Sequence, residues 1–68
     1  MIVVEEVDDT VYINGTNFAI TVTESDVRLI TARDLDREGI KALTEALEVA
    51  ERIHINKWIE AARERLNA

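Results

Sequence analysis

The fold of this chain is decided by residues 10–23, which read TVYINGTNFAITVT. Apolar and polar residues alternate with a period of two on both sides of the segment 14–17, as in strands that bury one face. Asn-Gly is a frequent turn sequence, so the two runs predict an antiparallel hairpin. A four-residue connection would place Ile13 opposite Phe18. A two-residue Asn14-Gly15 turn is the alternative, and it keeps the same side chains on the same face.

The alternation extends beyond this hairpin in both directions. After a turn at residues 24–25, a third strand would place Val27 opposite Val22 and continue the apolar face. Residues 2–7 are expected to add a further strand, although apolar residues compete for its inward face and leave its register open. We therefore expect a three- or four-stranded antiparallel β-meander, with strands at about 2–7, 10–14, 17–23 and 27–31.

The hydrophobic period becomes helical from Leu35 onward. Asp36 is a suitable N-cap, Glu38 brings a negative charge to the first turn, and Leu35 is placed to pack on Ile40 as a hydrophobic staple. At about 100° per residue, apolar residues then fill roughly half of the helix circumference. A helix over about 36–53 is expected to pack across the sheet and to touch a second neighbour.

The apolar positions after Ile53 lie on another side of that helix, turned by roughly 140° from the first set. Either the chain breaks at 54–56, so that a short helix over about 56–66 folds back with Asn56 as its cap, or one continuous helix presents the second set to a partner. The break is our first hypothesis. We name this second set the Trp58 stripe, and it comprises Ile55, Trp58, Ile59, Ala62 and Leu66.

The charge of the chain is unevenly distributed. Every Lys and Arg lies at or after Arg28, so the net charge of -6 belongs to the first 27 residues. This predicts an acidic surface formed by Glu5, Glu6, Asp8 and Asp9, and it suggests a basic protein as a possible partner. The basic residues are interleaved with acids, which argues against direct binding of nucleic acid. No apolar run approaches the roughly 20 residues that span a bilayer, so we expect no membrane contact and a cytoplasmic protein.

Residues 34–45 begin with an acidic run, carry Gly39 at the sixth place and end on Glu45 at the twelfth, and this segment resembles the loop of calcium-binding EF-hand proteins. The calcium ligands that this resemblance implies are Asp34, Asp36, Glu38 and Glu45. It departs from that family at the eighth place, where Lys41 replaces the usual aliphatic residue. The competing interpretation is that the same residues form the first turns of the helix, and on that interpretation no metal site is expected.

Catalytic chemistry has little support in the sequence. There is no cysteine, and Ser25 lies in an expected turn without a histidine nearby in the sequence. His54, the only histidine, falls within the apolar arc of the helix, so we interpret it as a structural residue at a kink or an interface. No enzyme activity and no cofactor are expected.

These observations together predict a single α+β domain over residues 1–68 that acts through protein contacts. The preferred hypothesis is a homodimer, or another homo-oligomer, formed through the Trp58 stripe, with Trp58 as the anchor. The alternative is a small acidic inhibitor or regulator, of the kind that phages encode, which binds a basic or nucleic-acid-binding protein. A calcium-stabilised module and an engineered chain without a natural function are further alternatives.

Overall fold

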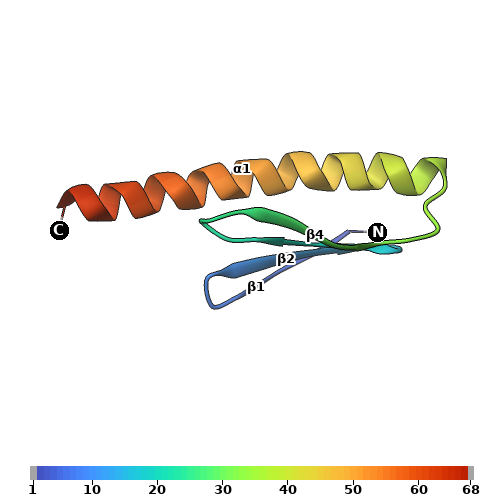
Figure 1. The fold of residues 1–68 in the computed structure, drawn as a ribbon, viewed down its shortest axis with the longest axis horizontal. Helices are drawn as coiled ribbons and strands as arrows, with labels where there is room; N and C mark the ends of the chain where they lie inside the picture. The colour runs from blue at the N-terminus through green and yellow to red at the C-terminus, as the bar shows by residue number, and fades with distance from the viewer. Residues whose placement is uncertain (1, 68) are drawn as a thin grey trace.

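The computed structural model of this protein describes residues 2–67, which form a four-stranded antiparallel sheet and one long helix (Figure 1). The elements are β1 (Val3–Val7), β2 (Thr10–Gly15), β3 (Phe18–Val22), β4 (Val27–Ala32) and α1 (Arg37–Asn67). The strands lie in the sheet in their order along the chain, β1-β2-β3-β4. The α+β fold and the β-meander predicted from the alternating pattern are confirmed.

The β2–β3 hairpin turns at Thr16-Asn17, not at Asn14-Gly15, and Ile13 lies opposite Ile20 rather than Phe18. The predicted register is therefore wrong by two residues. Asn17 adopts a left-handed backbone with φ of 67°, which asparagine tolerates better than most residues. Gly15 pairs with Phe18, whose ring occupies the space where a Cβ of residue 15 would stand. A shift of two residues keeps each side chain on its predicted face.

The registers of the two outer strands complete the sheet. Val22 lies opposite Val27 in the β3–β4 hairpin, as predicted. The pairing slips at a bulge between Leu29 and Thr31, which leaves Ile30 without a direct partner on β3. In the β1–β2 hairpin, Val4 lies opposite Ile13, so Val4 is on the helix-facing side of the sheet. The open question about the first strand is thereby answered.

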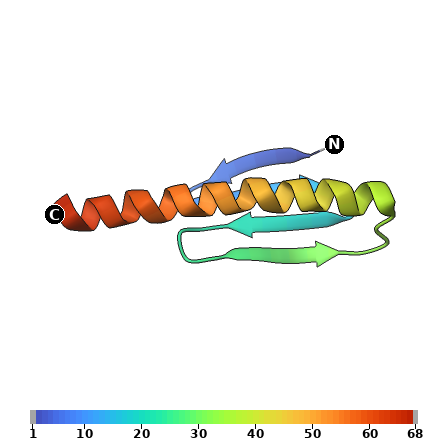
Figure 2. The ribbon, with the colours of Figure 1, turned by 90° about the horizontal axis from the view of Figure 1, so that it is seen from above.

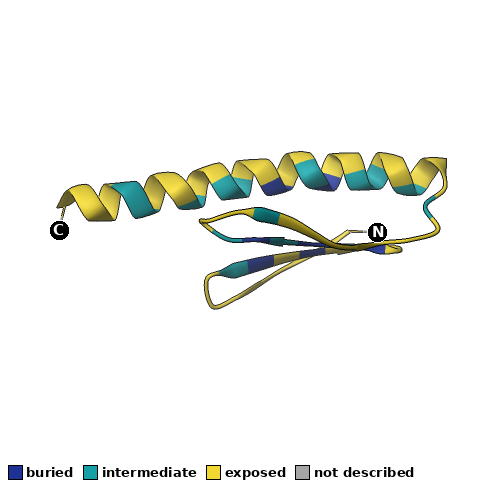
Figure 3. Cartoon of the chain, in the orientation of Figure 1, coloured by how far each residue is buried: buried dark blue, intermediate teal, exposed yellow. Residues whose placement is uncertain are grey.

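The hydrophobic core lies between the helix and the two central strands. Helix α1 runs above β2 and β3, while β1 and β4 flank it on either side (Figure 2). Two alanines, Ala46 and Ala50, are the buried residues of the helix, and their small side chains let its backbone approach the sheet closely (Figure 3). The sheet contributes the other buried core residues, which are Val11, Ile13, Phe18, Ile20 and Val22.

The start of α1 follows the prediction at its cap. The carboxylate Oδ1 of Asp36 accepts a hydrogen bond from the backbone N–H of Gly39 at 2.8 Å, the geometry of an N-cap. Leu35 packs against the core, whereas Ile40 remains 55% exposed, so the apolar contact expected between these two residues does not bury Ile40.

Helix α1 continues through residues 54–56 without interruption. The predicted break and the separate helix over about 56–66 are therefore wrong, and the alternative of one continuous helix is confirmed. No glycine or proline interrupts the segment. Its 31 residues reach about 46 Å at 1.5 Å per residue, whereas strands of five or six residues reach about 20 Å. The C-terminal part of the helix consequently extends beyond the end of the sheet (Figures 1 and 2).

Candidate interaction surface

The Trp58 stripe lies on the solvent side of the C-terminal half of α1. Trp58 is 59% exposed, Ile55 54%, Ile59 37% and Leu66 85%, while Ala62 is half-buried. At about 100° per residue, the centre of the stripe lies about 140° around the helix from Ala50, which faces the sheet. The sheet therefore cannot cover these side chains.

Three polar contacts hold the C-terminal half of the helix against the sheet. His54 Nδ1 lies 2.8 Å from the carbonyl oxygen of Thr23, at the start of the β3–β4 turn. Lys57 Nζ lies 3.2 Å from Glu6 Oε2 on β1, and a longer ion pair of 4.0 Å joins Arg65 Nη2 to Glu24 Oε1. Because these contacts lie on both flanks of the helix, they fix its rotation and keep the Trp58 stripe pointing outward.

His54 does not lie at a kink, because α1 is continuous there; it lies between the helix and the sheet, where it contacts Thr23. A carbonyl oxygen can only accept a hydrogen bond, so the hydrogen of this contact belongs to Nδ1 of the imidazole. The sequence did not identify Thr23 as its partner, because a backbone carbonyl leaves no trace in a residue pattern.

The predicted acidic residues do not share one surface. Glu5 lies on the face of the sheet opposite the helix, whereas Glu6 lies on the helix side and contacts Lys57. Asp8 and Asp9 form the β1–β2 turn, where Asp8 adopts φ of 56°.

Acidic side chains from distant parts of the sequence meet instead at one end of the sheet. An open hollow of about 390 Å³ lies there between the helix and two turns of the sheet. Its acidic lining residues are Asp9, Glu24, Glu60 and Glu64. Only Asp9 belongs to the predicted acidic set. The other three are distant from Asp9 in the sequence and lie near it only in the folded structure.

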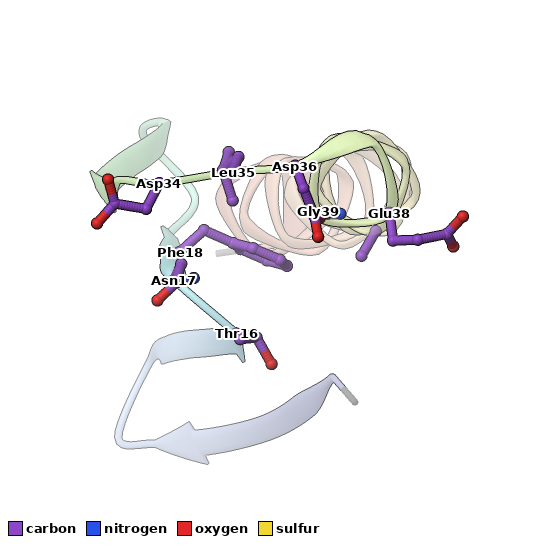
Figure 4. Close-up of a pocket in the computed structure, with 9 residues that line it drawn as sticks. Thr16, Asn17, Phe18, Asp34, Leu35, Asp36, Glu38 and Gly39 are labelled. Carbon is purple, nitrogen blue, oxygen red and sulfur yellow. Dashed lines mark hydrogen bonds between the residues drawn. The ribbon is translucent and has the colours of Figure 1, made fainter.

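The calcium-loop hypothesis is not supported by the arrangement of its residues. Glu38 and Glu45 belong to the regular helix α1, and the carboxylate of Asp36 caps that helix. The carboxylates of Asp34 and Glu38 point to opposite sides of a hollow of about 290 Å³ (Figure 4). Within residues 2–67, no group of three or more His, Cys, Asp or Glu side chains could hold a metal ion. Residues 36–45 form the cap and the first turns of α1.

Within the part of the chain that the structure describes, no helix has both the length and the apolar character needed to cross a membrane. No protein-family model, curated protein or solved structure matches this chain.

Proposed function

We propose that this protein is a small, non-enzymatic protein-interaction domain that forms a homodimer through the Trp58 stripe. The observation that supports this proposal is the exposure of Trp58, Ile55 and Leu66 on a helix that extends beyond its own sheet. Single exposed apolar residues are ordinary on protein surfaces, but a contiguous row of large ones is typical of an interface.

The stripe supplies part of the area that an interface needs. Its exposed side chains offer on the order of 400 Å² of apolar surface, and two such stripes would bury about twice that area. Specific interfaces begin at about 1,200 Å² in total, so polar residues beside the stripe must contribute the remainder. Trp58 is the expected centre of the contact, because large aromatic side chains dominate the binding energy of interfaces.

The spacing of the stripe favours another helix as the partner element. Trp58 and Ile59 follow Ile55 by three and four residues, Ala62 follows Ile59 by three, and Leu66 follows Ala62 by four, which places these side chains along one side of the helix. Side chains in such rows pack into the grooves of a second helix. A second copy of this chain supplies a helix with the same row, and the overhang of α1 leaves room for it beside the sheet.

The oligomeric state of a Trp58 variant tests this proposal. Sedimentation equilibrium of the wild-type protein is expected to give at least the mass of a dimer, and Trp58→Ala is expected to lower this mass by removing the association through the helix. Circular dichroism of the variant should remain that of the folded protein, because Trp58 is largely exposed. A wild-type protein that stays monomeric, or a variant whose mass equals that of the wild type at every concentration, would contradict the proposal.

A second candidate function is binding of a basic protein segment. It is supported by the hollow whose lining includes the four acids Asp9, Glu24, Glu60 and Glu64 and one basic residue, Lys57. Calorimetric titration with an oligolysine peptide should detect binding that weakens as salt increases. Replacing Glu60 and Glu64 with Gln should reduce the affinity and its salt dependence, and an unchanged titration would remove this candidate.

A further inference from the structure

The outer face of the sheet, opposite the helix, is unusually poor in charge. The strand pairings place on this face the residues Val3, Glu5, Val7, Thr10, Tyr12, Asn14, Ala19, Thr21, Arg28 and Thr31. Among these described strand residues only Glu5 and Arg28 are charged, although 32% of the whole chain is. No other element of the described chain covers this face (Figure 1).

Large apolar side chains are exposed on this outer face. Val3 is 46% exposed, Val7 52% and Tyr12 38%. A solvated sheet face normally carries alternating polar and charged residues, with several charges that keep copies apart. On the outer face, the described strand residues other than Glu5 and Arg28 are uncharged.

The two charges occupy corresponding places at opposite edges of the sheet. Glu5 on β1 lies opposite Tyr12, Tyr12 opposite Thr21, and Thr21 opposite Arg28 on β4, so the four form one row across the strands. Three strand spacings of about 4.8 Å separate the two ends, so Glu5 and Arg28 of one molecule are about 14 Å apart. They cannot form an ion pair within one molecule. Arg28 contacts the neighbouring Asp26 through its Nε at 3.3 Å, on the exposed surface.

We infer that a second copy of this chain packs on the outer face, sheet against sheet, with β1 of each copy above β4 of the other. A two-fold axis parallel to the strands, between β2 and β3, produces this arrangement. It places Glu5 of each copy opposite the partner's Arg28, and Tyr12 opposite the partner's Thr21. A two-fold axis perpendicular to the strands would instead place β1 above β1 and β4 above β4, so that residues of like charge lie at the same edge. Aligned sheets pack about 10 Å apart with this kind of stacking.

This contact is independent of the Trp58 stripe, because the two surfaces lie on opposite sides of the molecule. A protein that uses both would assemble beyond the dimer, either as a closed tetramer or as an extended chain. The sheet contact must therefore be measured where the helix contact has been removed.

The test uses charge exchange in a Trp58→Glu background, in which sedimentation equilibrium reports the sheet contact alone. The Trp58→Glu protein is expected to dimerise. Adding either Glu5→Arg or Arg28→Glu alone should weaken this dimerisation about tenfold or more, and adding both substitutions together should restore it. Restoration is specific to the proposed pairing, because the two residues are too far apart to meet within one copy. Thermal melts of each variant check that the fold is intact.

The outcomes separate this inference from the proposed function. The sheet contact is overturned if the Trp58→Glu protein is monomeric at every concentration. It is also overturned if the single charge exchanges do not change dimerisation, or if the double exchange does not restore the dimer. The difference in mass between the wild-type protein and Trp58→Glu tests only the contact through the Trp58 stripe.

Discussion

His54 Nδ1 lies 2.8 Å from the carbonyl oxygen of Thr23, a residue that precedes it by 31 positions in the chain. This hydrogen bond joins the middle of helix α1 to the β3–β4 turn, where the sheet ends. Lys57 and Glu6 form the corresponding contact on the other flank of the helix. The helix is thereby attached at the point from which its C-terminal part extends into solvent.

Removing the imidazole should destabilise the protein measurably. His54→Ala leaves the Thr23 carbonyl without its donor, and we expect a loss of about 1 kcal/mol in the free energy of unfolding. Urea denaturation at a fixed protein concentration measures it, because dimerisation makes stability depend on concentration. His54→Asn is the control, since its amide N–H can occupy the place of Nδ1 and should recover part of the loss. Equal losses in both variants would show that the hydrogen bond contributes little.

The two glycines should respond very differently to alanine. At Gly15 a Cβ would overlap the ring of Phe18, a core side chain, so Gly15→Ala is expected to cost about 2 kcal/mol or more. At Gly39 a Cβ would lie 3.1 Å from Leu35 Cδ2, the end of a side chain that can move. Alanine there also gains up to about 1 kcal/mol of helix propensity, so Gly39→Ala should be nearly neutral. Urea unfolding curves of both variants measure these changes. An unchanged free energy of unfolding in Gly15→Ala would contradict the close packing of Phe18 on Gly15.

The cap of α1 should contribute to stability without any metal. Asp36→Ala removes the acceptor for the Gly39 N–H and is expected to cost about 1 kcal/mol, whereas Asp36→Ser should retain most of the stability. The melting temperature of the wild-type protein should be the same in calcium and in chelator. A melting temperature that rises with calcium would revive the ion-binding hypothesis.

A matched pair of isoleucines separates the Trp58 stripe from general hydrophobicity. Ile55 is 54% exposed and Ile40 is 55% exposed, and both lie on α1. Ile55→Glu should weaken dimerisation by tenfold or more, because it buries a charge at the proposed interface, while Ile40→Glu should leave it unchanged. Light scattering over a concentration series measures both. Equal weakening by the two variants would mean that the contact is not confined to the stripe.

The sequence alone was sufficient for the strands, for the cap at Asp36 and for the composition of the Trp58 stripe. Alternation with a period of two is a local property of the chain, because successive side chains of a strand point to opposite faces. The N-cap is equally local, since Asp36 bonds to a backbone group only three residues away. A two-residue error in the β2–β3 register did not disturb the assignment of faces, because it preserved this parity.

The tertiary structure decided the features that depend on contacts between distant residues. The change of apolar side after Ile53 suited either a break or a continuous helix, and local propensity alone did not distinguish them. In the structure the helix continues and His54 meets Thr23 across the interface. The row from Glu5 to Arg28 likewise arises only when four strands pair in register. Short-range periodicity thus determined the elements and their faces, whereas long-range pairing decided which faces are left exposed.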